Sequence, residues 1–360
     1  MKDIKKYFYF VLLLGYMLCL IIWSENIKIY IVNSIKICIE VIIPSLYIFM
    51  ILSDFLITSN MYAIIGKPFS FVSRYIFKIP EHLFSVFLIS SIAGYPVGAK
   101  LLSNLLQEKI IDKQDAEDML TYCYLSGPAF ICGAVGVNVF SDVKIGVLIF
   151  GSIIFSNVII AIIIGITRTP PPPNTYKDNL EIKFGHLIMS IANGGKNIFS
   201  ICTIIVFFSS LICIIEKSGL VSFVAKIIDD IFNYDYSNSV AVIKSFLEIS
   251  NIILFDDNIK NLPIITALVS WGGLCVLFQI KGLISNRISM ISFLFFRVMS
   301  MFLSYFICEI LCIITFERYL YSSSSIQVGC GQNSPILTLF LLIMTILFLL
   351  KFSIEKKRKI

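Results

Sequence analysis

The feature of this sequence that most restricts its fold is a Gly-Tyr-Pro motif at residues 94–96, in the middle of an apolar stretch that runs from Leu83 to Leu102. A Ser-Gly-Pro motif at residues 126–128 interrupts a second apolar stretch. In a bilayer, a broken helix leaves N–H and C=O groups that lipid cannot satisfy. Such breaks are tolerated only where they are buried in protein or line a cavity, and transporters build substrate sites from helices of this kind.

The composition indicates a membrane protein. Hydrophobic residues make up 58% of the 360 residues, charged residues only 14%, and the mean hydropathy is +0.90. Soluble domains carry roughly 25% charged residues. We expect an all-α polytopic transmembrane protein with about eight spans, because each span needs roughly 20 residues. The apolar run 7–23 lacks a small-residue cleavage site after it, so we expect a first transmembrane helix there rather than a signal peptide.

Basic residues flank both ends of the chain, in the segments 2–6 and 351–359. Positive charge beside a span marks the cytoplasmic side, so we expect both termini in the cytoplasm and the lipid bilayer as a partner. The net charge of +6 comes without the basic and aromatic surface that a nucleic acid would need. The ten cysteines and two histidines show no metal-ligand spacing, and no catalytic motif is present. We therefore expect no metal, no cofactor and no enzymatic activity.

Four consecutive prolines at 170–173 divide the chain, since they stop any helix and favour a stiff spacer. Each side of the spacer shows the same order: a span, an amphipathic piece, two interrupted apolar segments and a span. On the first side these are 36–57 (interrupted near Pro44), 61–78, 82–106, 119–140 and 143–166, and Asp112 is expected to cap a helix that begins near Lys113. On the second side they are 197–215, 220–232, 240–256, 262–281 and 286–315, with a last span at 336–351. This order predicts two related halves, with some broken segments re-entrant. The expected divisions are an N-terminal helix and loop (1–35), a first membrane half (36–166), a cytoplasmic linker (167–183), a second membrane half (184–316), and a loop, last span and basic tail (317–360).

In the first half, a helix is expected to begin at Pro96 and to present free N–H groups and the positive end of its dipole at the break. Gly94 and Gly98 allow close approach of a ligand or another backbone, and Lys100 adds a positive charge one turn into the helix. This combination suits an anionic group. The alternative is a kinked helix in which glycine and proline serve packing and Lys100 reaches the headgroups. Ser126 and Gly127 repeat the pattern at the second break.

In the second half, Glu248 and Asn251 lie in an apolar run. A buried acid in a span usually binds an ion or a proton, or acts as a counter-charge; the alternative is a helical pair with Lys244. Arg297 is expected to neutralise Glu248, to contact an acidic substrate, or only to fix helix packing. Gln279, after the Gly-Gly break at 272–273, offers an amide donor and acceptor. The expected substrate-binding residues are Gly94, Tyr95, Pro96, Gly98, Lys100, Ser126, Gly127, Glu248, Asn251, Gly272, Gly273, Gln279 and Arg297.

These motifs resemble the sporulation integral membrane protein YlbJ family, whose membrane core is described as a nucleoside-recognition or Gate domain. The matching segments are 44–49, 94–100, 126–130, 247–248 and 272–279. The resemblance implies a protein of the mother-cell-derived membrane around the forespore that moves dipicolinate, a pyridine dicarboxylate, toward the spore. The chain departs from the family pattern after Glu248, where Ser-Asn-Ile stands at 250–252 in place of the expected glycines.

Together these features predict a secondary membrane transporter of a small organic anion, and the resemblance implies that this anion is dipicolinate during endospore formation. Glu248 and Gln279 would bind a coupling proton or Na⁺, or the ring of the ligand. Two alternatives stand beside it. One is a non-transporting membrane scaffold required for sporulation, and the other is an ion-coupled nucleoside carrier.

Overall fold

The computed structural model describes residues 2–166, 168–171, 180–232, 234–284 and 288–320, and these residues form helices and connections without strands. The expected all-α class is confirmed. Five helical segments within these ranges are long and apolar enough to cross a membrane: Ser24–Thr58, Val143–Ile166, Phe184–Lys217, Ile259–Leu283 and Ile291–Thr315. The count of about eight spans stays a prediction, and the last expected span, at 336–351, lies outside the described residues.

The chain begins with α1 (Lys2–Ile22), followed by α2 (Ser24–Ile37) and α3 (Ile43–Thr58). A π-helical turn, Cys38–Ile42, joins α2 to α3 without a break. Pro44 lacks the N–H that would bond the carbonyl of residue 40, and a wider turn just before it relieves this mismatch. The interruption expected near Pro44 is therefore a change of helical pitch.

The rest of the first half follows the expected order. Asp112 caps α7, because its Oδ1 accepts a hydrogen bond of 2.7 Å from the Asp115 N–H, as the sequence predicts. The helix expected from Pro96 begins one residue earlier. The elements are α4 (Tyr62–Gly66), the 3₁₀-helix Lys67–Phe69, the π-helix Val72–Phe77, α5 (Glu81–Ala93), α6 (Tyr95–Gln107), α7 (Lys113–Tyr122), the π-helix Ala129–Val137 and α8 (Val143–Ile166).

The second half also contains long, short and interrupted helices. Its first helix is longer than the span expected at 197–215, because it begins at Phe184. The elements are α9 (Phe184–Lys217), α10 (Leu220–Phe232), α11 (Tyr236–Leu247), the 3₁₀-helices Ile249–Leu254 and Ile259–Asn261, α12 (Leu262–Trp271), α13 (Gly273–Leu283) and α14 (Ile291–Leu320).

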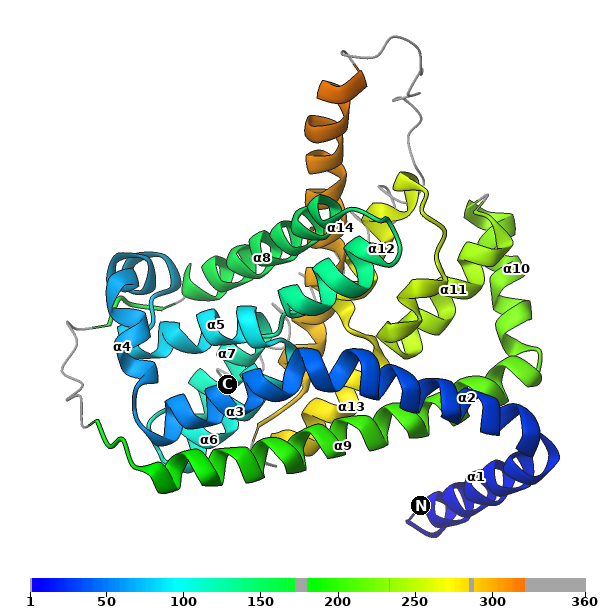
Figure 1. The fold of residues 1–360 in the computed structure, drawn as a ribbon, viewed down its shortest axis with the longest axis horizontal. Helices are drawn as coiled ribbons and strands as arrows, with labels where there is room; N and C mark the ends of the chain where they lie inside the picture. The colour runs from blue at the N-terminus through cyan, green and yellow to red at the C-terminus, as the bar shows by residue number, and fades with distance from the viewer. Residues whose placement is uncertain (1, 167, 172–179, 233, 285–287, 321–360) are drawn as a thin grey trace.

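Helices from the two halves of the sequence pack against each other. The long helix α2–α3 lies beside α9 and runs in the opposite direction (Figure 1). Gly194 permits this approach, because a Cβ there would lie only 2.8 Å from Ile51 Cγ1. Helix α14 packs against α8 and α12, and α6 packs against α13. A continuous buried cluster joins these elements, whereas the apolar side chains of α1 are mostly exposed, as expected for a helix that faces lipid.

The described ends of the linker lie at one end of the molecule. Arg168, just after α8, forms ion pairs of 2.7 Å with Asp115 and 2.5 Å with Asp118 on α7. At the other end of the linker, the N–H of Glu181 donates to the carbonyl of Ser59, directly after α3. The ends of α3 and α8 and the start of α9 therefore share one end of the helix bundle, which we call the linker end (Figure 1).

Candidate substrate site at the helix breaks

The two breaks of the first half touch each other through their backbones. Gly94 separates α5 from α6 with a φ of +94°, which favours glycine. A Cβ at Gly94 would lie 3.2 Å from Gly127 N, and one at Gly127 would lie 3.5 Å from Gly94 Cα. The chain therefore needs a small residue at both positions, as the sequence motifs suggest.

The two breaks of the second half meet in the same way. Glu248 has an extended backbone between α11 and the 3₁₀-helix Ile249–Leu254. Gly272 and Gly273 separate α12 from α13 with φ angles of +82° and +80°. A Cβ at Gly273 would lie 3.3 Å from Glu248 Cα. The breaks predicted at 94–96, 126–128 and 272–273 are present, and the interruption predicted within 240–256 lies at Glu248.

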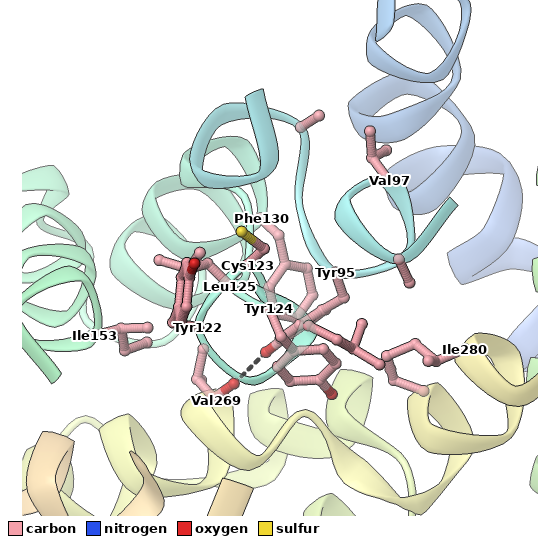
Figure 2. Close-up of a cluster of buried hydrophobic side chains, with 14 of the residues drawn as sticks. Tyr95, Val97, Tyr122, Cys123, Tyr124, Leu125, Phe130, Ile153, Val269 and Ile280 are labelled. Atoms are coloured by element: carbon pink, nitrogen blue, oxygen red, sulfur yellow. Dashed lines mark hydrogen bonds between the residues drawn. The ribbon is translucent and has the colours of Figure 1, made fainter. Parts of the chain in front are cut away.

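Two tyrosines connect the breaks of the two halves. The Tyr95 hydroxyl donates to the carbonyl of Val269, and the Tyr124 hydroxyl donates to the carbonyl of Trp271 at 3.0 Å. These carbonyls belong to the last turn of α12, which leaves them without helical partners. Figure 2 shows Tyr95 and Tyr124 lying together beside Val269, with ring centroids 4.6 Å apart. A Cβ at Gly272 would lie 2.0 Å from the Tyr124 hydroxyl, so the second-half break is shaped to receive this side chain.

Arg297 stabilises the chain just before the break at 126–128. Its guanidinium is fully buried and donates to Tyr124 O at 2.9 Å, to Asn157 Oδ1 at 2.7 Å and to Thr121 O. It also lies 4.7 Å from the centre of the Tyr124 ring. The Thr121 carbonyl belongs to the last turn of α7, the negative end of the helix dipole, and Tyr124 follows the end of that helix. These bonds fit the interpretation in which Arg297 fixes helix packing, and none of them goes to Glu248.

The breaks enclose a cavity of about 40 Å³, which we call the break cavity. Its volume suits a few water molecules or a small cation. Seven of the thirteen residues expected at the site line it: Gly94, Tyr95, Pro96, Ser126, Gly127, Glu248 and Gln279. The rest of the wall consists of Ile42, Ser45, Leu46, Phe130, Ile201, Ile205, Ile249, Ser250 and Val276. The breaks of both halves thus contribute to one cavity.

The other six expected residues lie around the break cavity. Gly98 permits close packing, since a Cβ there would lie 2.3 Å from Cys123 O. Asn251 hydrogen bonds to Glu248, and Lys100 lines a separate small cavity beside Asp54. Gly272, Gly273 and Arg297 hold the breaks in place through the contacts described above.

Glu248 is buried and surrounded by neutral donors. Its side chain is 5% exposed, and its carboxylate accepts bonds from Ser250 N at 3.1 Å, from the Ser250 hydroxyl and from Asn251 Nδ2 at 3.2 Å. The alternative partner, Lys244, instead pairs with Glu216 Oε2 at 2.8 Å. A buried carboxylate without a cationic partner is costly. A proton or a cation bound beside Glu248 would remove that cost.

A wider cavity of about 550 Å³, which we call the vestibule, adjoins the break cavity. The two cavities share Ile205, Glu248 and Ser250 in their walls, so the Glu248 carboxylate lies where they meet. Charged and polar side chains also line the vestibule: Tyr30, Asn33, Ser34, Lys36, Glu40, Asn138, Ser209, Lys244 and Asn251. A cavity of this size accommodates a small organic molecule.

The sequence gives little indication of the residues that stabilise the breaks through contacts with distant parts of the chain. Tyr124 and Asn157 bond to groups far along the chain, and only Asn157 carries a signal, as a polar residue inside an apolar span. Within the described ranges, no group of three His, Cys, Asp or Glu side chains lies close enough to hold a metal ion.

Comparison with known proteins gives one partial match. The sporulation integral membrane protein YlbJ of Bacillus subtilis (strain 168) is 36% identical to this chain over 110 residues, which are 31% of this chain and 27% of that protein. The match thus covers about a quarter of the relative's length. No family model matches the chain, and no solved structure matches it. The chain is therefore similar to a sporulation integral membrane protein over about a third of its length, and this likeness supports a YlbJ-like membrane family.

Proposed function

We propose that this protein is a secondary membrane transporter of a small organic anion, dipicolinate during endospore formation, and that the break cavity is its substrate site. One observation carries the proposal: three helix breaks and helix α13, which begins at the fourth break, line a cavity that contains a buried carboxylate and adjoins a wide vestibule. Discontinuous helices that meet between repeats are how secondary transporters form substrate sites. The choice of dipicolinate rests on the resemblance to the YlbJ family.

The proposed topology has about eight crossings in two related halves, with both termini in the cytoplasm. The order of elements supports this division, since a long helix, short amphipathic pieces and two interrupted segments precede a closing long helix on each side of the linker. With the linker in the cytoplasm, the linker end faces the mother cell. We place the protein in the mother-cell-derived membrane around the forespore.

Binding of an anion requires Glu248 to be neutralised. Two unit charges 4 Å apart interact with about 4 kcal/mol at an effective dielectric constant of 20, and here the charges would be alike. A proton or Na⁺ at Glu248 cancels this repulsion and restores the attraction of the helix N-termini that begin after Gly94 and Gly127. The substrate therefore binds together with a cation, and Glu248 couples the two.

The side chains that contact the anion are Ser126 and Gln279. Ser126 is fully buried, and in the described part of the chain its hydroxyl makes no hydrogen bond of normal geometry. Gln279 is 4% exposed and places its amide in the same cavity. Because the break cavity is smaller than a pyridine dicarboxylate, the breaks must open to admit the substrate, and the adjoining vestibule is wide enough to accommodate it on one side of the breaks.

The test is uptake of radiolabelled dipicolinate into proteoliposomes under proton, sodium and potential gradients. Gln279→Leu removes the amide from the break cavity, and Gln114→Leu makes the same change at an exposed position on α7. We expect saturable uptake by the wild type and by Gln114→Leu, and an uptake at least about tenfold lower for Gln279→Leu. No uptake by a folded wild-type preparation would favour the scaffold, and saturable uptake of uncharged nucleosides alone would favour the nucleoside carrier.

A further inference from the structure

A third cavity lies on the opposite side of the break cavity from the vestibule. It is small, about 10 Å³, and we call it the polar cavity because Ser53, Asp54, Lys100, Asn104 and Asn197 line it. Asp54 is 6% exposed, and its Oδ2 accepts a hydrogen bond of 3.1 Å from Asn193 Nδ2. Lys100, Asn104 and Asn197 are only half-buried, so the outer wall of this cavity reaches the surface.

One face of α9 connects the three cavities. Asn197 lines the polar cavity, Ile201 lines the break cavity, Ile205 lines both the break cavity and the vestibule, and Ser209 and Ile212 line the vestibule. Steps of three and four residues place all five on one face of a helix. The rise from the first to the last is about 22 Å at 1.5 Å per residue.

One face of α2–α3 shows the same succession. The vestibule is lined by Tyr30, Ser34, Ile37 and Val41, the break cavity by Ile42 and Leu46, and the polar cavity by Met50 and Asp54, in steps of three or four residues on each side of the π-helical turn. From Tyr30 to Asp54 the helix rises about 36 Å, which exceeds the hydrocarbon thickness of about 30 Å. The three cavities therefore follow one another along two neighbouring antiparallel helices over a distance that crosses a bilayer.

Apolar side chains close the passage between the break cavity and the polar cavity. Met50, Val97 and Ile201 are each almost fully buried, and they lie on the turns of α3, α6 and α9 where one cavity gives way to the other. On α6, Pro96 faces the break cavity, and Lys100 stands one turn further toward the linker end. The break cavity thus adjoins the vestibule, whereas these three side chains separate it from the polar cavity.

We propose that the polar cavity is the second end of the translocation path and a binding station for the same organic anion, in which Lys100 receives a carboxylate of the substrate. This inference rests on the proposed transport function and adds a site to it. The lysine supplies the positive charge, and Asn104 and Asn197 supply amide donors. The carboxylate of Asp54 competes with the substrate for Lys100, so the anion is held weakly enough to leave. Lys100 therefore acts at the linker end of the path.

The kinetic test separates this station from the break cavity. Lys100→Gln removes the charge, and Lys196→Gln makes the same change at an exposed position of α9 next to Asn197. With substrate supplied from the vestibule side, we expect Lys100→Gln to keep KM within about threefold and to lower the maximal rate by about tenfold, with Lys196→Gln unchanged. Equal rates for the two variants, or a large rise of KM with an unchanged maximal rate, would overturn the inference. A wild type without uptake would instead refute the proposed function.

A second test measures the two ends of the path without relying on transport. Asn33→Cys places a thiol in the vestibule, and Asn104→Cys places one in the polar cavity. Right-side-out and inverted vesicles are treated with a membrane-impermeant thiol reagent, and labelling is read on the peptide that carries the new cysteine, because the chain has ten native cysteines. We expect the two positions to be labelled from opposite sides of the membrane. Labelling of both from the same side would contradict a path that crosses it.

Discussion

Replacing Arg297 by lysine should weaken the fold by several kcal/mol although the charge is kept. The guanidinium bonds Tyr124 O and Asn157 Oδ1 at 2.9 and 2.7 Å, and it bonds Thr121 O as well. A buried hydrogen bond to a charged group contributes about 1.5–3 kcal/mol. A lysine ammonium lacks the planar fork that reaches three acceptors. With two of the three bonds lost, we expect a destabilisation of roughly 3–5 kcal/mol.

Thermal unfolding in detergent measures this change. One of the two tryptophans of the chain, Trp271, lies at a helix break, and its carbonyl accepts a hydrogen bond from the Tyr124 hydroxyl. Intrinsic tryptophan fluorescence therefore reports on unfolding of the breaks. A loss of this size corresponds to a fall in Tm of roughly 5–10 °C. Arg74→Lys, at a half-buried arginine outside the breaks, is the matched control. A Tm of Arg297→Lys equal to that of the wild type or of the control would refute the role assigned to this residue.

Three further changes follow from the same contacts. Gly272→Ala should lower the free energy of unfolding by about 2–4 kcal/mol, because its Cβ would lie 2.0 Å from the Tyr124 hydroxyl at a positive φ; Gly195→Ala, in an open helical position, is the control, and equal melting of the two would contradict this account. Tyr95→Phe should lower it by about 1–2 kcal/mol in the same melting assay, since its acceptor carbonyl loses its donor; an unchanged Tm would speak against it. Glu248→Gln should leave uptake insensitive to proton and sodium gradients, and persistent dependence on either gradient would exclude Glu248 as the coupling group.

The sequence predicts the breaks well because their causes are local. Glycine and proline at 94–96 and 126–128 and two glycines at 272–273 disrupt helical hydrogen bonding wherever the chain folds. The predicted cap at Asp112 is local too, since it involves a residue three positions away. The π-turn before Pro44 replaces a predicted interruption because a wider helical turn relieves the proline at a lower cost than a break.

The sequence predicts the partners of charged residues poorly, because these lie far away in the chain. Lys100 is four residues after Pro96 and shares its helical face, but it stands about 6 Å further along the axis, which places it beside Asp54 and outside the break cavity. Lys244 pairs with Glu216 on α9, and Arg297 bonds Thr121 on α7 and Asn157 on α8. A single sequence contains no local signal for these contacts. Glu248 is different, because an acid in an apolar span is costly in any arrangement and the sequence alone therefore predicts a functional role for it.

The proposed substrate site lies where the helix breaks of the two halves meet. A structure determined by electron cryomicroscopy in saturating dipicolinate shows whether the substrate binds there. We expect density for the dicarboxylate in an enlarged break cavity, within hydrogen-bonding distance of Ser126 and Gln279 and close to Glu248. Density for the ligand at a site that none of these residues line, in a preparation that transports it, would refute this assignment.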